Sequence, residues 1–400
     1  MTVKEILKQT PIYTLYKGFM KTNLYKKYIK IKTAQKPFLN NVFATKYILN
    51  CLLIYITDPF VHGISNLHQN SWQCIEIAKA ISKRGYNIDV AYYDNPNVKL
   101  QKKYDFIIGL IPRHIDIYSN FQNKNCIKVA YLTSSNLRFT SEEERKRIED
   151  LEIRRGIKLL PRRQTQTIEK SIETFNACFF IGNEYNFKTY AEFKMPPVYY
   201  IKNNGYKLPF ETDFSKKDAK KFLFLGSVGQ VHKGLDLLLE IFERKPELEL
   251  FICASISQEE DFENAFYKEL YETPNIHTFG FVNVFSDKFK EISDQCAYLI
   301  FPSCAEGQAG SVSTAMSAGC IPIISKMCGF SEKEGILLDN CTIECIEKNI
   351  DEYSAKDNKW VVNNCKARVK IIEEDYSEQS FLKSINDALD GVLNAVKDNR

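Results

Sequence analysis

The chain has 400 residues, of which 44% are hydrophobic and 26% are charged. These are the proportions of a globular protein, so they exclude a disordered chain and a fibrous repeat, and the length predicts about two domains. The formal net charge of +4 is uneven, because residues 1–47 hold ten lysines, no arginine and one acidic residue, a net +9 that leaves −5 for the remainder. A mildly acidic body argues against nucleic acid as a partner.

Residues 1–47 read as a basic, aromatic N-terminal arm. Ile12, Tyr16, Phe19 and Met20 share one helical face, and lysines surround them. Anionic lipid attracts segments of this kind, and aromatic side chains suit the membrane interface. Two interpretations stay open at this point: peripheral contact with a membrane surface, and an arm wrapped on the protein itself.

The twelve cysteines predict a reducing compartment. Most fall inside apolar runs, and none forms a C-x-x-C pair or a Cys/His ligand spacing. Buried, reduced thiols are typical of cytosolic proteins. No run approaches the ~20 apolar residues of a transmembrane helix, and the first 30 residues lack the apolar core of a signal peptide. We therefore expect a cytoplasmic protein, with peripheral contact at the inner membrane surface through the arm.

Short apolar runs alternate with helix-period segments after the arm. Runs of this kind suit strands buried on both faces of a parallel sheet. The first set of predicted strands covers residues 52–57, 88–93, 106–110, 127–132 and 178–181. One of the helices between them is expected over residues 71–84, with Asn70 as its N-cap.

The pattern restarts after a loop-like stretch at residues 203–217. Predicted strands cover residues 222–226, 248–254, 276–280, 298–301 and 321–325, with helices from about positions 235, 259, 285 and 310. The fold class is therefore α/β, with two doubly wound, Rossmann-like domains in series. The expected division is an arm (1–47), an N-terminal domain (48–207), a C-terminal domain (208–375) and a last helix (376–400) that crosses back to the first domain.

The segment from Phe301 to Gly319 carries the most informative motif. A strand ends at Phe301, a loop presents Glu306, and a helix rich in small residues begins near Gly310. The free N–H groups and the dipole of a helix N-terminus form an anion site that suits a diphosphate. A carboxylate just before that site is placed to bind sugar hydroxyls. The alternative is an ordinary turn with a solvated glutamate.

A second strand runs into a glycine-rich loop between Gly226 and Gly234. Backbone N–H groups in such a loop can cradle phosphate, and Lys233 adds positive charge. The spacing is not that of a Walker A loop. Taken alone, this loop is weak evidence, because glycine-rich turns beside a lysine are more often structural.

Together these segments resemble the donor domain of the GT-B glycosyltransferases, most closely glycosyltransferase family four. The resembling pieces are the Gly226 to Gly234 loop, N-I-H-T-F-G-F-V at residues 275–282, and P-S-x-x-E-G at residues 302–307 with A-M-x-A-G-x-I-P-I-I-S after it. The resemblance implies two domains that face each other across a cleft and the transfer of a sugar from a nucleotide-diphosphate donor of UDP or GDP type. It also implies retention of anomeric configuration.

The resemblance assigns roles to individual residues. It implies that Lys233 neutralises the donor diphosphate and that Glu306 hydrogen-bonds the transferred sugar. His232 either assists the diphosphate or lies on the loop surface. The residues it implies for donor binding are Gly226, Ser227, His232, Lys233, Glu306, Gly307, Gln308, Ala309, Gly310, Ser311 and Thr314.

Two positions depart from the family pattern. The family often has an arginine where Ser227 stands, and usually a second glutamate where Thr314 stands. The first change removes a bidentate phosphate contact, and the second removes an acceptor for the ribose hydroxyls. Both bear on the affinity for the nucleotide and on its identity.

The N-terminal half offers acceptor or phosphate candidates at the ends of its predicted strands, where open α/β sheets bind ligands. His68, with Asn70, opens the first helix, and His68 is a third catalytic candidate. Gly63 and Thr133 lie at the same rim. The alternative is that Asn70 only caps the helix and that His68 is solvated. Four arginines further on have the chemistry to bind a lipid diphosphate or an anionic glycan; they are Arg154, Arg155, Arg162 and Arg163.

The sequence thus predicts a transferase that moves a sugar from a nucleotide sugar to a glycan or lipid-linked acceptor of a cell-surface polysaccharide. No D-x-D motif is present, so we expect neither a metal nor another cofactor. Two alternatives remain. One is a sugar-nucleotide epimerase on the same fold, and the other is a catalytically silent GT-B partner subunit, which the residues at 227 and 314 favour.

Overall fold

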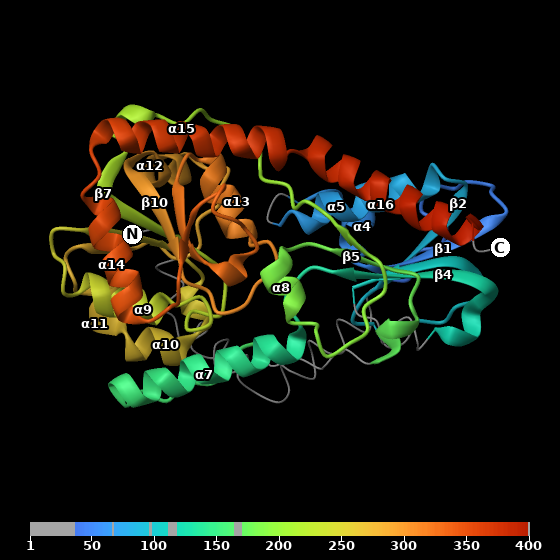
Figure 1. Cartoon of the computed structure of the whole chain (residues 1–400), viewed down its shortest axis with the longest axis horizontal. Coiled ribbons are helices and arrows are strands. Elements are labelled where there is room, and N and C mark those ends of the chain that lie inside the picture. Colours follow the sequence, from blue (N-terminus) through green and yellow to red (C-terminus); the bar gives the residue numbers. More distant parts are fainter. Residues whose placement is uncertain (1–36, 66–67, 96–97, 111–117, 164–169, 399–400) are drawn as a thin grey trace, which may run out of the picture.

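Two parallel sheets divide the molecule into two α/β units (Figure 1). The computed structural model describes residues 37–65, 68–95, 98–110, 118–163 and 170–398. The first sheet has six strands in the order β2-β1-β3-β4-β5-β6, and every neighbouring pair is parallel. Its strands are β1 (Leu49–Tyr55), β2 (Tyr86–Tyr92), β3 (Tyr104–Gly109), β4 (Gln122–Leu132), β5 (Ala177–Phe180) and β6 (Val198–Tyr200).

The second sheet is also parallel and six-stranded, in the order β12-β11-β10-β7-β8-β9. Its strands are β7 (Asp218–Leu225), β8 (Glu249–Cys253), β9 (Ile276–Thr278), β10 (Cys296–Phe301), β11 (Ile321–Ser325) and β12 (Ile336–Leu338). The chain winds outward in both directions from the β7/β10 pair, which is the topological switch point of a doubly wound sheet. The predicted fold class, two Rossmann-like units, is confirmed.

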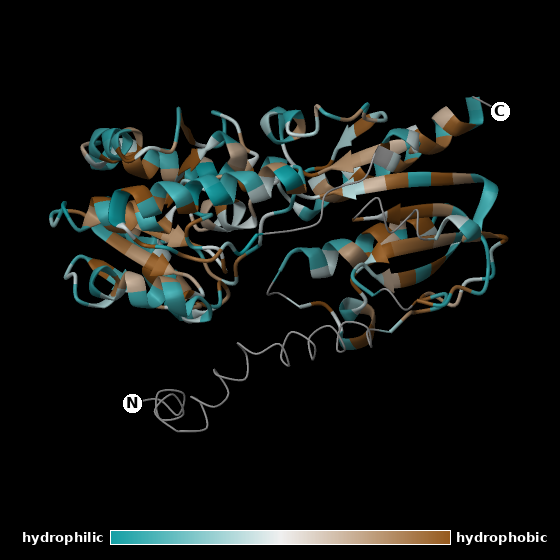
Figure 2. Ribbon diagram, turned by 90° about the horizontal axis from the view of Figure 1, so that it is seen from below, coloured by the Kyte–Doolittle hydropathy of each residue, from teal (hydrophilic) through white to brown (hydrophobic). Residues whose placement is uncertain are grey.

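All ten predicted strands are present, with ends that differ by a few residues. The two strands that the sequence did not predict are β6 and β12, each of three residues at a sheet edge. Hydrophobic residues run along the strands of both units (Figure 2). Because helices cover both faces of each sheet, the central strands are buried along most of their length.

Helices flank each sheet, at the predicted positions and at others that the sequence did not predict. In the first unit they are α4 (Asp58–His62), α5 (Asn70–Ser82) and α8 (Glu184–Lys188), with the 3₁₀ turns η1 (Ser119–Phe121) and η2 (Lys170–Thr174). In the second unit they are α9 (Leu235–Phe242), α10 (Glu260–Ala265), α11 (Tyr267–Tyr271), α12 (Asp287–Gln295), α13 (Gly310–Ser317), α14 (Ile343–Ser354) and α15 (Asn358–Asp375), with η3 (Phe214–Lys216), η4 (Ile256–Gln258) and η5 (Lys326–Cys328).

The N-terminus of α5 differs from its prediction by one residue. Gln69 is the N-cap and Asn70 is the first helical residue, so the expected side-chain cap by Asn70 is wrong. The backbone N–H of Asn70 instead donates to Nδ1 of His68 at 3.1 Å. The apolar face of α5 packs on the first sheet through Cys74 and Ile77, as its periodicity indicates.

Helix α7 (Leu137–Arg155) follows the fourth strand of the first unit but packs against the second unit (Figure 1). Leu151 is fully buried in the core of the second unit. Nη2 of Arg147 donates to the carbonyl of Pro302 at 2.8 Å, and Arg154 pairs with Asp236 at 2.7 Å. The charge pattern of residues 141–155 predicts a solvated helix with i,i+4 pairs. Arg138 and Glu142 form such a pair, but arginines at the other end of the helix pair with the second unit, so the helix is solvated on one side only.

Helix α16 (Glu378–Asp398) continues from α15 and runs back over the first unit (Figure 1). Phe381, Ile385 and Leu389 belong to the core of that unit, and the ring of Phe381 contacts Trp72 edge to face. The end of the chain therefore spans both units.

The expected arm falls mainly outside the described residues, because residues 1–36 are not among them. Its last part belongs to the first unit. Leu39 pairs with Val90 as an antiparallel bridge, and Phe43 packs on the core beneath it. Leu39 and Phe43, which the expected division places in the arm, therefore contact the first unit. No helix within the described ranges has the length and apolar character needed to cross a membrane.

Candidate functional site

A cleft of about 300 Å³ lies between the two units, at the carboxyl ends of β7 and β10. Its position at the switch point of the second sheet is where open α/β folds bind ligands. The volume lies at the lower end of the range for small-molecule sites. Nine of the predicted site residues line the cleft: His68, Gly226, Ser227, Lys233, Glu306, Ala309, Gly310, Ser311 and Thr314.

The turn from β7 to α9 positions Lys233. Gly234 has a positive φ of 77°, and a Cβ there would lie 2.7 Å from Pro302, so the close approach of the turn to the next loop requires glycine. The stem of Lys233 packs against Gly226, and its ammonium lies 5.5 Å from the centre of the Phe301 ring. The lysine side chain is 5% exposed and is therefore held in one place.

The same turn does not offer all its N–H groups to a ligand. The backbone N–H groups of Gly229 and Gln230 donate to the carboxylate of Glu259, which is itself buried. The expectation that this loop cradles phosphate is therefore wrong for these two groups. Glu259 follows β8 and η4 in the chain, and nothing in the local sequence signals its contact with a loop 29 residues away.

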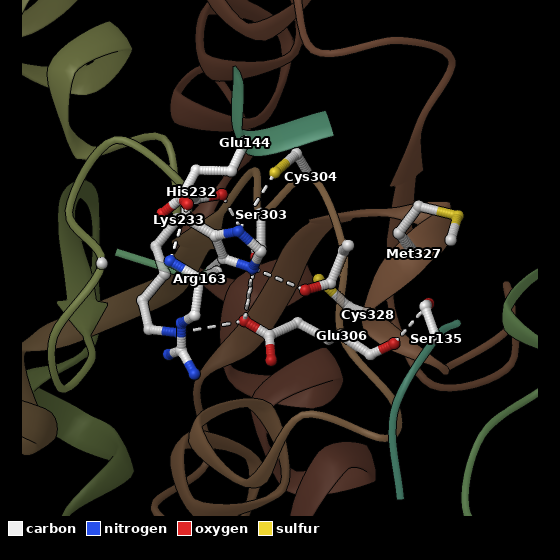
Figure 3. Close-up of polar contacts among 12 residues, drawn as sticks. Ser135, Glu144, Arg163, His232, Lys233, Ser303, Cys304, Glu306, Met327 and Cys328 are labelled. Atoms are coloured by element: carbon white, nitrogen blue, oxygen red, sulfur yellow. Dashed lines mark hydrogen bonds and ion pairs between the residues drawn. The ribbon is translucent and has the colours of Figure 1, made fainter. Parts of the chain in front are cut away.

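Glu306 and Lys233 meet at the floor of the cleft, although 73 residues separate them. Oε1 of Glu306 accepts from Nζ of Lys233 at 3.0 Å and from Oγ of Ser303 at 2.9 Å (Figure 3). Burial alone would raise the pKa of Glu306, but the charge of Lys233, with smaller effects from His232 and Arg163, lowers that pKa to about 2. The carboxylate is therefore ionised and accepts hydrogen bonds at neutral pH.

The backbone of Glu306 is held by the first unit. Its carbonyl accepts from the N–H of Ser135 at 2.8 Å, from the hydroxyl of Ser135 at 2.6 Å and from Nδ2 of Asn186 at 3.0 Å. Asn186 is fully buried and also donates to the carbonyl of Met327 at 2.8 Å. The Glu306 loop thus forms part of the contact between the units.

His232 lies behind the wall of the cleft rather than in it. Its Nε2 is 2.6 Å from the carbonyl of Ala305, so this nitrogen carries the proton, and Nδ1 then accepts from the thiol of Cys304 at 3.3 Å. Burial lowers the pKa of His232 to about 3, so the ring is neutral at neutral pH. Neither expectation, a diphosphate contact or a place on the loop surface, describes this position, because the ring supports the Glu306 loop from inside.

Gly307 and Gln308 face the first unit instead of the cleft. A Cβ on Gly307 would overlap the carbonyl of Thr133, so only glycine permits this approach. Gln308 accepts from the backbone N–H of Asn203 at 2.8 Å. Both residues therefore help to join the units, and their expected role in donor binding stays a prediction.

Three predicted acceptor-side residues do not line the cleft. Thr133 contributes its carbonyl to the contact with Gly307, and Asn70 lies within α5. Gly63 is exposed, and a Cβ there would have no neighbour within 4 Å. His68, in contrast, lies at the cleft, and partial burial there lowers its pKa below the ordinary value.

The N-terminus of α13 faces the cleft. Gly310 and Ser311 are its first residues, and the first N–H groups of a helix have no acceptor within it. The hydroxyl of Thr314 donates to the carbonyl of Gly310 at 2.7 Å. This end of the helix is therefore suited to an anion.

Sequence reasoning missed Gln69 and Tyr206 as polar side chains of the cleft, and it named Arg163 only among four arginines suited to a lipid diphosphate or an anionic glycan. Gln69 is 7% exposed, its Nε2 has no partner, and its Oε1 would lie 2.8 Å from a Cβ on Gly310. The hydroxyl of Tyr206 is also buried without a partner, and Arg163 enters from the segment after α7. Within the ranges that the structure describes, no three His, Cys, Asp or Glu side chains are grouped so that they could hold a metal ion.

Part of the chain matches a known protein family. Residues 219–355 match the family described as glycosyl transferases group 1. A comparison with curated protein sequences finds no match.

Solved structures resemble the chain at low sequence identity. Sucrose-phosphate synthase from Thermosynechococcus elongatus has a TM-score of 0.59 at 12% identity, over 87% of this chain and 100% of that one. HepE from Anabaena, in complex with UDP and glucose, has a TM-score of 0.53 at 11% identity, over 87% and 100%. TarM from S. aureus has a TM-score of 0.49 at 15% identity over 70% of this chain, which spans only 53% of TarM.

The similar structures support the fold, and the family match supports the resemblance found in the sequence. Residues 219–355 therefore match the glycosyl transferases group 1 family, and they lie in a chain whose two-domain fold is that of GT-B structures.

Proposed function

We propose that the chain transfers a sugar from a nucleotide-diphosphate donor of UDP or GDP type to a glycan or lipid-linked acceptor, with retention and without a metal. The observation that carries the proposal is the pair of Lys233 and Glu306, which meet at 3.0 Å beside the N-terminus of α13. The family match of residues 219–355 and the UDP and glucose bound by the similar HepE structure support the same class of donor.

Different groups of the cleft act on the leaving group and on the sugar in this reaction. Lys233 and the first N–H groups of α13 stabilise the negative charge of the leaving nucleoside diphosphate. The ionised carboxylate of Glu306 accepts hydrogen bonds from sugar hydroxyls, since a pKa of about 2 leaves it no proton to donate at neutral pH. The acceptor hydroxyl then attacks from the face that the leaving phosphate vacates, and no carboxylate forms a covalent intermediate.

The test is to incubate the full chain with UDP- and GDP-sugars, alone and with glycan acceptors, and to follow the sugar by NMR. A product with the anomeric configuration of the donor, formed equally well in EDTA, is expected. Epimerised donor in the absence of acceptor would favour the epimerase instead. A chain that neither binds nor consumes any nucleotide sugar would favour the silent partner subunit.

We also propose that the basic arm contacts anionic lipid. Ten lysines and one acidic residue in residues 1–47 support this proposal. The full chain should sediment with vesicles of anionic phospholipid at low salt and not with neutral vesicles. Equal sedimentation with both kinds of vesicle would contradict an electrostatic contact.

A further inference from the structure

Four arginines follow one another along the end of α7 and the segment after it, and three of them are engaged by carboxylates. Arg154 pairs with Asp236 at 2.7 Å, and Arg155 pairs with Glu269 at 2.6 Å. Arg162 pairs with Asp261. These ion pairs fasten the segment to the second unit, so they use arginines for which the sequence had suggested an external anion.

Arg163 is the exception among the four. Its guanidinium has no carboxylate within ion-pair distance in the described part of the chain, and it lines the cleft together with Lys233. Nη2 donates to the carbonyl of Val228 at 3.1 Å, which keeps the group on the turn after β7. Nε is buried without a partner and lies against Gly229, whose missing side chain leaves room for it.

The backbone at Arg163 is fixed from below by α7. The carboxylate of Glu144, which is 1% exposed, accepts from the N–H of Arg162 at 2.9 Å and from the N–H of Arg163 at 2.6 Å. The hydroxyl of Ser141 donates to the carbonyl of Arg163 at 3.1 Å. These contacts fix the backbone so that the side chain of Arg163 points into the cleft. Arg163 is therefore positioned by α7 and does not belong to a free surface loop.

The cleft therefore holds an excess of positive charge. Among its lining residues, Arg163 and Lys233 are cations and Glu306 is the anion that lies beside them (Figure 3). His232, which supports the same loop, is neutral because burial lowers its pKa to about 3. Two cations with one carboxylate leave a positive charge that an anionic ligand would neutralise.

We propose that Arg163 binds the diphosphate of the nucleotide-sugar donor, so that a residue outside the family-matched domain completes the donor site. This inference rests on the proposed function, because it names a further binding group for the same donor. The guanidinium fork suits phosphate oxygens. Ser227, which carries no charge, lies in the turn after β7, and Arg163 contacts that turn through the carbonyl of Val228. Because Arg163 lies in the segment after α7, at the junction of the two units, donor binding then depends on that junction.

The test measures binding of UDP and GDP to the full chain by calorimetry. The variant Arg163→Gln should weaken binding of the preferred nucleotide by about ten- to a hundredfold, the loss of one charge-assisted hydrogen bond. Arg163→Lys should restore part of the affinity. Ser227→Arg in the Arg163→Gln background should also restore part of it, because it returns a cation to the same turn.

The matched control is Arg162→Gln, which removes the neighbouring ion pairs with Asp261 and Glu259 but changes no residue of the cleft. It should alter nucleotide affinity by less than about twofold, and both single variants should unfold at similar temperatures without ligand. Equal loss of affinity in the two variants would show that Arg163 acts only through structure and would overturn the inference. Unchanged affinity in Arg163→Gln, with a wild type that binds, would overturn it as well. A wild type that binds none of the nucleotides would instead refute the proposed function.

Discussion

Removal of the carboxylate at Glu306 should destabilise the second unit as well as stop transfer. The side chain of Lys233 is 5% exposed and that of Glu306 is 20% exposed, so Glu306→Ala leaves a cation inside the protein without its partner. Removing one partner of a buried ion pair lowers the free energy of unfolding by about 3–5 kcal/mol. Because Glu306 is partly exposed, we expect the lower end of this range, about 3 kcal/mol. For a unit of this size that corresponds to a fall of about 6–12 °C in the unfolding temperature.

The assay is thermal unfolding of the wild type, Glu306→Ala, Lys233→Met and the double variant that carries both substitutions. Removal of both charges leaves no buried group unpaired, so the double variant should be more stable than Glu306→Ala. Each of these variants should lose sugar transfer. Stability changes that simply add in the double variant would refute the argument, because they would show that the two side chains do not depend on each other.

Three further predictions follow from the same geometry. Burial lowers the pKa of His232 to about 3, so below about pH 6.5 the unfolded chain takes up a proton that the folded chain does not. The free energy of unfolding therefore falls as the pH falls from about 6.5 to about 3. His232→Gln should therefore remove about 2 kcal/mol of the acid destabilisation at pH 5, measured as the difference in urea unfolding between pH 7.5 and pH 5; an unchanged difference would contradict the burial argument. Asn186→Ala removes a buried donor from the carbonyl of Glu306 and should lower the free energy of unfolding by about 1–3 kcal/mol. It should also raise the rate of proteolysis between the units, and a rate equal to that of the wild type would refute the role of Asn186 at this contact. Gln69→Leu should weaken nucleotide-sugar binding severalfold if the unpartnered amide beside Gly310 faces the ligand, and unchanged affinity would exclude that contact.

The strands and the central pair of the site were accessible from the sequence because their signals are local. Each central strand is a short run of apolar residues between turns, and parallel strands buried on both faces require such runs. Lys233 and Glu306 each follow a predicted strand. The convergence of the two residues was expected from the resemblance to the GT-B donor domain, and it follows in the structure from the pairing of β7 with β10, whose carboxyl ends meet at one edge of the sheet. The edge strands β6 and β12 were missed, although β9 is equally short and was predicted.

The remaining site residues could not be predicted because long-range contacts position them. Arg163 reaches the cleft only because Glu144 and Ser141 of α7 fix its backbone and the arginines before it attach that segment to the second unit. Glu259 takes the N–H groups of the Gly229 turn from a position that shares no motif with it. The expected first domain, 48–207, includes α7, and its contact with the second unit was missed for the same reason. The helix pairs several charges with that unit besides burying Leu151 there, and a charged helix face looks the same in sequence whether it meets solvent or carboxylates.

The side chain of Glu306 is held by the second unit and its backbone carbonyl by the first. This links the chemistry of the cleft to the arrangement of the units. Its carboxylate is bound by Lys233 and Ser303 of the second unit, whereas its carbonyl accepts three hydrogen bonds from Ser135 and Asn186 of the first. Separation of the units would break all three of those bonds and release the loop that carries the carboxylate. The carboxylate is therefore held in place from both sides only when the units are together, and that is also the arrangement in which the cleft has walls from both of them. A donor bound between those walls should accordingly stabilise the closed arrangement, because contact with both units is available to it only there.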